Sequence, residues 1–166
     1  WANYLLHRSE TEYLKQINSY LKATNSPFEI ELTGAHDNIL ERVVFHATRP
    51  LVLPSDGPLV SVIIAAYRAE DTIEYAINSI LNQTYKNIEV LICDDGSDDN
   101  TKLVLQKFAG DSRVRTFESA ANQGPYNIRN WMISKSNGEV ITFHDSDDVA
   151  LPAKLLEQHN VHTRFF

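Results

Sequence analysis

The chain has 166 residues, a length that fits one domain or one domain with an extension. Hydrophobic residues make up 43% and charged residues 22%, which is ordinary globular usage and argues against disorder over most of the length. With 15 basic and 22 acidic side chains the net charge is −7, so bulk electrostatics exclude a basic nucleic-acid-binding protein.

Cysteine usage and hydropathy indicate the compartment. Cys93 is the only cysteine, so no internal disulfide can form and a reducing environment is expected. Because it lies in an apolar run, we interpret Cys93 as a small core residue. No apolar stretch has the length of a transmembrane helix, and residues 1–24 carry charges throughout, unlike a signal peptide. We expect a cytoplasmic protein, with peripheral contact to the cytoplasmic face of a membrane left open.

The first 50 residues are expected to form an extension. Apolar side chains fall on one face of a helix over residues 4–22, and Pro27 follows its end. Residues 28–32 alternate like a strand, whereas the segment from Ile39 to Phe45 fits either a strand or a helix. Prolines and a glycine between residues 50 and 58 predict a linker, which divides the chain into an extension (1–55) and a main domain (56–166).

After the linker, short apolar runs alternate with helical patterns. The runs predict buried strands, and the segments between them and after the last one predict helices; the strands are Leu59–Ala66, Ile88–Ile92, Val114–Phe117 and Val140–Phe143. Strands that are apolar on both faces and separated by amphipathic helices predict a parallel, Rossmann-like α/β sheet covered on both sides. In such sheets ligands bind at the carboxyl ends of the strands, and the acidic residues concentrate in those loops.

Three carboxylates directly follow the last predicted strand, at Asp145, Asp147 and Asp148. Like charges this close repel, and a cation among them relieves the repulsion. Oxygen ligands suit Mg²⁺ or Mn²⁺, and such an ion at a strand end usually has a phosphate group as its other partner. The same acids also occur in ordinary turns and helix caps, so the cluster alone leaves both readings open.

Five segments of residues 59–162 occur in a distinctive order. They contain an apolar strand ending in Tyr67, an S-x-L-x-Q-T-Y segment, a D-D-G-S-x-D block, N-x-G followed by R-N, and G-E-x-I-x-x-x-D-x-D-D ending at Asp148. Together they resemble the inverting family 2 glycosyltransferases with the GT-A fold. The resemblance implies an enzyme that moves a sugar from a nucleotide-diphosphate sugar to a glycan or other hydroxyl acceptor. It implies a UDP-sugar as the donor, and polysaccharide or surface-glycan synthesis as the process.

The resemblance also implies roles for particular residues. It assigns Asp95 to the uracil imide, and it assigns the ribose and the metal-bound diphosphate to the acidic cluster. Tyr67 fits stacking on the base or packing, and Arg129 fits a positive charge near the nucleotide or an ordinary surface position. The implied nucleotide-sugar-binding set is Ala65, Ala66, Tyr67, Asp95, Arg129, Asp145, Ser146 and Asp147. The implied ligands of Mn²⁺ or Mg²⁺ are Asp147, Asp145 and Asp148.

An inverting transfer also needs a general base. In the resembled family this acid lies well downstream of the acidic cluster, so we expect it beyond Phe166 and expect the chain to be truncated at its C-terminus. Two alternatives remain: a catalytically silent nucleotide-binding or scaffolding module, and a nucleotidyltransferase. The segment Ala65–Arg68 lacks the glycines that a nucleotidyltransferase loop normally carries.

Overall fold

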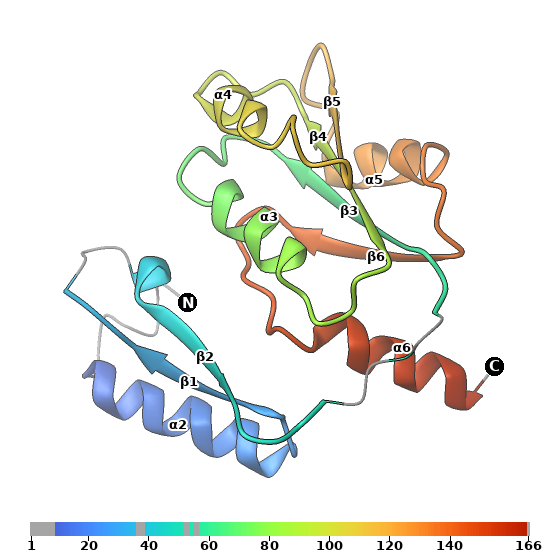
Figure 1. Ribbon diagram of the computed structural model, residues 1–166. Coiled ribbons are helices and arrows are strands. Elements are labelled where there is room, and N and C mark those ends of the chain that lie inside the picture. The colour runs from blue at the N-terminus through green and yellow to red at the C-terminus, as the bar shows by residue number, and fades with distance from the viewer. Residues whose placement is uncertain (1–8, 36–38, 52–53, 55–56, 166) are drawn as a thin grey trace. The chain divides into compact units, whose positions relative to one another are not determined.

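The computed structural model describes residues 9–35, 39–51, 54 and 57–165. The chain divides into two compact units, Trp1–Val52 and Leu53–Phe166, which are described separately (Figure 1). The domain boundary expected between residues 55 and 56 falls outside the described residues. Among the described helices, none combines the length and apolar character that a bilayer crossing requires.

The first unit contains a helix and a β-hairpin. Its elements are α2 (Glu10–Ala23), β1 (Phe28–Leu32), the short 3-10 helix η1 (Ile39–Glu41) and β2 (Val43–Ala47). The helix predicted over residues 4–22 is described from Glu10 onward, and residues 4–8 lie outside the description. The segment from Ile39 onward, which fitted either a strand or a helix, contains a helical turn followed by a strand. The strand part forms because β2 pairs with β1 in an antiparallel register. The extension is therefore helical only in part.

Side chains of α2 hold the hairpin in place. The Asn18 side chain exchanges two hydrogen bonds of 2.8 Å with the backbone of Ile30, replacing ladder bonds on that side of β1. Arg42 reaches Glu10 at the start of the helix with two bonds of 2.7 and 2.9 Å. These contacts connect segments that are distant in sequence, which is what a small two-layer unit with little core needs.

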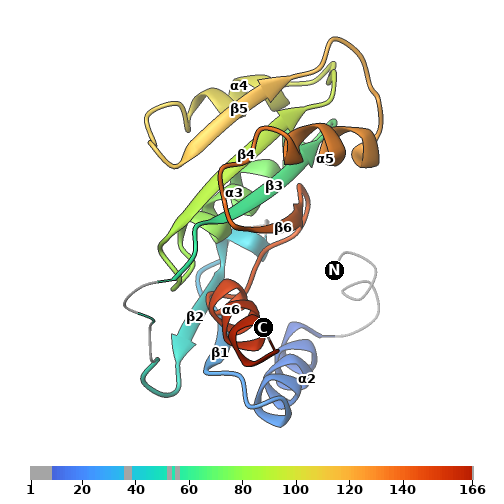
Figure 2. The ribbon, with the colours of Figure 1, turned by 90° about the vertical axis from the view of Figure 1, so that its right-hand side faces the viewer.

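The second unit is the predicted parallel α/β domain. Its elements are β3 (Val60–Ala66), α3 (Ile73–Leu81), β4 (Ile88–Asp94), α4 (Thr101–Gln106), β5 (Val114–Glu118), α5 (Pro125–Ile133), β6 (Val140–Asp145) and α6 (Lys154–Phe165). The strands run parallel in the order β5-β4-β3-β6. Figures 1 and 2 show α5 on one face of this sheet and α3 on the other.

Three strands extend further than the apolar runs predicted, and β5 does so by one residue, Glu118. β4 continues through Cys93 to Asp94, and β6 continues through His144 to Asp145. Hydrogen bonding to the central strand explains this, because Asp94 and Asp145 are in register with Ala66 and Ala65 of β3. The ladder thus carries both acidic loops to the same edge of the sheet.

The core beneath α5 confirms the interpretation of Cys93. Ile63, Leu91 and Cys93 of the sheet pack against Ile128 and Met132 of α5, and all five are buried. Burial, with the charges of nearby carboxylates, raises the pKa of the Cys93 thiol to about 12. The thiol is therefore protonated and inaccessible, as expected for a core residue.

Gln83, from the S-x-L-x-Q-T-Y segment, joins α3 to α6. Its side chain is fully buried, donates to the Leu151 carbonyl at 2.8 Å and accepts from the Leu155 N–H at 3.0 Å. A buried amide with both ends satisfied fixes the start of α6 relative to the sheet. The chain following the acidic cluster is therefore anchored at its far end.

A buried carboxylate, Glu89, lies near the amino ends of the strands, and the sequence alone did not indicate its role. Glu89 of β4 accepts from the Ser61 hydroxyl at 2.6 Å, from the Asn137 N–H at 2.5 Å and from Arg115 at 3.3 Å. Burial acts to raise the Glu89 pKa, but these hydrogen bonds outweigh it, and the pKa lies below its ordinary value. A Cβ on the neighbouring Gly138 would lie 2.4 Å from the Ser61 oxygen, so the turn before β6 requires glycine.

Candidate functional site

A pocket of about 400 Å³ opens at the carboxyl edge of the sheet. Its lining includes all eight residues of the predicted nucleotide-sugar-binding set, together with Asn122, Pro125 and Tyr126. Asp148, the third predicted metal ligand, is not among the lining residues. The three additional residues follow β5, and N-x-G with a proline at a helix start was the sequence signal that could have placed them here.

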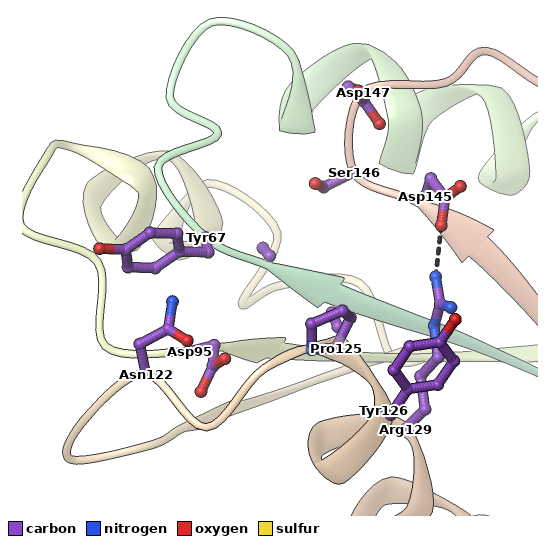
Figure 3. Close-up of a pocket in the computed structure, with 11 residues that line it drawn as sticks. Tyr67, Asp95, Asn122, Pro125, Tyr126, Arg129, Asp145, Ser146 and Asp147 are labelled. Carbon is purple, nitrogen blue, oxygen red and sulfur yellow. Dashed lines mark hydrogen bonds and ion pairs between the residues drawn. The ribbon is translucent and has the colours of Figure 1, made fainter.

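The lining residues form two groups (Figure 3). Tyr67, Asp95 and Asn122 lie at one side, from the loops after β3, β4 and β5. Arg129 and Tyr126, both from α5, lie at the other side beside Asp145 at the end of β6. Ser146 and Asp147 occupy the turn that follows β6. An aromatic side chain therefore lies on each side of the pocket, Tyr67 on one and Tyr126 on the other, and the Arg129 cation lies on the Tyr126 side beside Asp145.

Asp95 has a structural task in this arrangement. Only 2% of it is exposed, and its two carboxylate oxygens accept from the Gln123 N–H at 2.9 Å and the Gly124 N–H at 2.8 Å. Gly124 has a φ of 86°, a left-handed conformation that glycine adopts without strain. Asp95 therefore holds the N-x-G loop against the sheet. Its predicted contact with a base stays a prediction.

The preceding residue, Asp94, holds the turn of its own loop. Its Oδ1 accepts from the Ser97 N–H at 3.1 Å and from the Ser97 hydroxyl at 2.5 Å. Gly96 lies inside this turn with a φ of 72°, and a Cβ there would be 2.9 Å from the Ala121 backbone. Asp94 therefore supports the turn at Gly96.

Arg129 connects α5 to the acidic end of β6. Its NH2 group forms an ion pair with Asp145, and its guanidinium carbon lies 5.5 Å from the centre of the Phe143 ring. Its Nε is buried and has no hydrogen-bond partner among the described residues. Arg129 lines the pocket and thus brings a positive charge to it.

The acids after β6 are mostly exposed. Within the described part of the chain, the side chains of Asp147 and Asp148 have no hydrogen-bond partner, whereas Asp145 is paired with Arg129. No group of three or more His, Cys, Asp or Glu among the described residues is arranged to hold a metal ion. The donor set nevertheless suits Mg²⁺ or Mn²⁺, because such ions are commonly held by one or two carboxylates together with phosphate oxygens.

His144 lies buried behind the acidic turn. Its Nδ1 is 3.3 Å from the Lys154 ammonium, and its Nε2 has no hydrogen-bond partner among the described residues. Burial and the adjacent Lys154 charge lower the His144 pKa. Burial likewise lowers the Lys154 pKa. His144 is buried and is not among the residues that line the pocket.

The comparisons with known proteins agree with this geometry. Residues 61–163 match the model of the family described as "Glycosyl transferase family 2". This match covers more than half of the chain. The chain belongs to glycosyl transferase family 2.

Two relatives show how the likeness is distributed. The Escherichia coli UDP-Glc:alpha-D-GlcNAc-diphosphoundecaprenol beta-1,3-glucosyltransferase WfgD is 42% identical over 100 residues, which are 60% of this chain and 39% of WfgD. An uncharacterized glycosyltransferase of Rickettsia felis is 33% identical over 96% of this chain and 27% of its own length. The chain therefore spans between about a quarter and two fifths of these relatives, and the second match includes the N-terminal unit.

The fold is shared with a solved structure. Staphylococcus aureus TarS 1-349, in a complex with UDP-GlcNAc, has a TM-score of 0.59 and 28% identity over 63% of this chain and 31% of TarS. The α/β domain is thus the mostly parallel GT-A sheet that the sequence predicted.

Proposed function

We propose that this chain forms the nucleotide-sugar-binding part of a metal-dependent, inverting glycosyltransferase with a UDP-sugar donor. The observation that carries the proposal is the pocket at the carboxyl edge of the sheet, where acids after β6 lie beside Arg129 and across from Tyr67. The Arg129 cation with nearby acids suits a diphosphate, and the Tyr67 ring on the other side of the pocket suits a base. The name of WfgD and the TarS complex with UDP-GlcNAc support uridine.

The base and ribose are assigned to the β3 side of the pocket. The backbone of Ala65, Ala66 and Tyr67 would contact them, and the Tyr67 ring would stack on the base. Asp95 would accept from the uracil imide while keeping its two backbone bonds, because each carboxylate oxygen has a second lone pair. Ser146 would add a hydroxyl near the ribose or the phosphates.

The diphosphate is assigned to the β6 side with Mg²⁺ or Mn²⁺. Asp147 and Asp145 would hold the ion, and Asp148, which does not line the pocket, would act from further away. When bound, the ion supplies Lewis-acid stabilisation of the leaving diphosphate. Arg129, which lines the pocket, would contribute a second positive charge near the same oxygens.

The acceptor is proposed to be a glycan or other hydroxyl in polysaccharide or surface-glycan synthesis. Its oxygen would form a bond to the anomeric carbon, the bond from that carbon to the diphosphate would break, and the hydroxyl proton would pass to a general base. No residue of this chain is assigned as that base. By its name WfgD acts on a diphosphoundecaprenol-linked acceptor, which supports work at the cytoplasmic face of a membrane.

Calorimetric titration of UDP into this chain, with Mn²⁺ and then with EDTA, tests the proposal. We expect binding that needs the metal and that Asp147→Ala weakens by about tenfold or more. Absence of binding under both conditions, in a chain that is folded by circular dichroism, would contradict the proposed site.

The alternatives give different results in the same titration. Metal-independent binding that Asp147→Ala leaves intact would favour the silent nucleotide-binding module. A nucleotidyltransferase would consume a nucleoside triphosphate and release pyrophosphate, and membership of glycosyl transferase family 2 argues against it.

A further inference from the structure

The loops that follow β3 and β4 are joined by hydrogen bonds between side chains and backbone. The Ala69 N–H donates to the Thr101 hydroxyl oxygen at 2.8 Å, and the Glu70 N–H donates to Asp99 at 3.2 Å. In return, the Glu70 carboxylate accepts from the Asn100 N–H at 2.9 Å and from its side-chain amide at 2.7 Å. The loop after β4 therefore holds the backbone of the loop after β3 in one conformation.

Arg68 occupies the centre of this junction. Its Nε and NH2 groups donate to the two oxygens of Asp98 at 2.6 and 2.8 Å, a bidentate geometry. Its backbone N–H donates to the Ser97 hydroxyl at 3.0 Å, and Asp94 holds that same hydroxyl. Arg68 is thus fixed to the D-D-G-S-x-D block through both its backbone and its side chain.

The backbone of Arg68 has an uncommon conformation. Its φ is 49°, in the left-handed region where residues with a Cβ are rare. Such conformations persist where surrounding interactions determine them, and they cluster at functional sites. The bonds to Ser97 and Asp98 provide that determination, and the resulting bend directs the chain from β3 into the junction.

Tyr67 is the residue that this bend positions. It lines the pocket and is 42% exposed, so packing alone holds it weakly. The Arg68 guanidinium carbon lies 5.2 Å from the centre of the Tyr67 ring, within cation–π range. The guanidinium therefore contacts the carboxylate of Asp98 and the ring of Tyr67, while neither Arg68 nor Asp98 lines the pocket itself.

We propose that Arg68 and Asp98 are positioning residues that hold Tyr67 in place for the nucleotide base. The inference rests on the proposed function in one respect, namely that a base is what Tyr67 meets. An exposed ring that is already oriented loses less freedom when a base stacks on it, so the pair raises nucleotide affinity without contacting the ligand.

Two measurements on Asp98→Asn test this clamp, by which we mean the ion pair of Arg68 with Asp98. Hydrogen exchange of the ligand-free chain is expected to become faster at the amides of residues 67–70 and to stay unchanged at residues 122–128. UDP affinity with Mn²⁺ is expected to fall about three- to fivefold, the size expected of an exposed bidentate ion pair. Glu74→Gln is the matched control, because Glu74 forms an exposed ion pair with Lys107, with 2.5 Å between the charged atoms. Neither residue lines the pocket. This control should change neither reading.

A double-mutant cycle with Tyr67→Ala identifies the route of the effect. If Asp98 acts through Tyr67, Asp98→Asn loses its effect on affinity once the ring is absent. An equal loss in both backgrounds would overturn the inference, as would unchanged exchange at residues 67–70. Arg68→Gly, which removes the guanidinium and makes a positive φ easy to adopt, should reproduce the affinity loss in a chain that still folds.

Failure of the proposed function gives a different result. In that case the unaltered chain binds no UDP, and the base-positioning role falls with it, whereas exchange still decides whether the pair orders the loop. Failure of the inference alone leaves the unaltered chain and Asp98→Asn with the same measurable affinity.

Discussion

Two acidic loops lie at the carboxyl ends of β4 and β6, the strands on either side of β3, and their carboxylates have opposite surroundings. At the end of β4, Asp94 and Asp95 are 3% and 2% exposed, and both accept hydrogen bonds from backbone N–H groups. After β6, Asp147 and Asp148 are exposed and have no hydrogen-bond partner among the described residues. The same residue type at the same edge of one sheet therefore performs two different tasks.

The difference shows how to separate structural acids from ligand-binding acids. A carboxylate whose oxygens already accept backbone N–H groups stabilises a turn, and its removal leaves donors unsatisfied. A carboxylate that is exposed beside like charges gains little from the fold and becomes favourable when a cation arrives. The number of acids in a loop does not distinguish these cases, whereas their hydrogen-bond donors do.

The largest effect is expected in the first loop. Asp95→Ala removes the acceptor of the Gln123 and Gly124 N–H groups, so the free energy of unfolding should fall by about 2–3 kcal/mol. Urea denaturation followed by circular dichroism measures it. Asp95→Asn, which keeps one acceptor oxygen, should lose less. A loss below about 0.5 kcal/mol for the alanine variant would make the loops alike.

The reverse pattern is expected in the second loop. Asp147→Ala should leave the free energy of unfolding within about 0.5 kcal/mol, because its carboxylate has no described partner. The same variant should lower metal-dependent UDP affinity by about tenfold or more, equivalent to about 1.4 kcal/mol. Denaturation and calorimetry on one preparation separate the two quantities. A stability loss as large as that of Asp95→Ala would remove the contrast.

Acid should weaken the first loop through Asp99. Burial acts to raise the Asp99 pKa, but hydrogen bonds from Thr101 and from the Glu70 backbone outweigh it, and the pKa is lowered. A lowered folded-state pKa adds stability that is complete above the unfolded value of about 3.9 and is lost as pH falls through the folded value. The urea midpoint of Asp99→Asn should therefore fall less steeply between pH 5 and pH 2.5 than that of the unaltered chain. Parallel curves would show that Asp99 contributes nothing to this loss.

The smallest effect is expected for Asp148→Asn. Asp148 does not line the pocket, so UDP affinity with Mn²⁺ should fall only about twofold, as for a surface charge. Titration beside Asp147→Ala gives the comparison. A loss equal to that of Asp147→Ala would make Asp148 a direct metal ligand and would extend the ligand-binding part of the loop.

The sequence predicted the order and type of the elements in the α/β domain, because periodicity depends on local side-chain pattern. It placed the ends of β4 and β6 too early, since Asp94 and Asp145 belong to strands only through hydrogen bonds to β3. It left the segment beginning at Ile39 open for the same reason, because the partner strand β1 decides that conformation.

The candidate site was predicted as a set of residues but not as a set of contacts. Eight predicted residues line one pocket, yet the ion pair of Arg129 with Asp145 joins segments separated by a turn and a strand. The clamp of Arg68 on Asp98 and the buried bonds of Glu89 were likewise invisible. Only a glutamate inside an otherwise apolar strand hinted at the last of these.

The state of Cys93 makes this chain a ready background for site-specific labelling. Its thiol is fully buried with a pKa of about 12, and it is the only cysteine in the sequence. A maleimide dye should therefore react with a cysteine introduced at the pocket rim and leave Cys93 unmodified. Tyr126 lines the pocket and is 78% exposed, so Tyr126→Cys would carry a fluorophore whose emission reports nucleotide occupancy. Binding could then be followed in real time without first removing a native thiol.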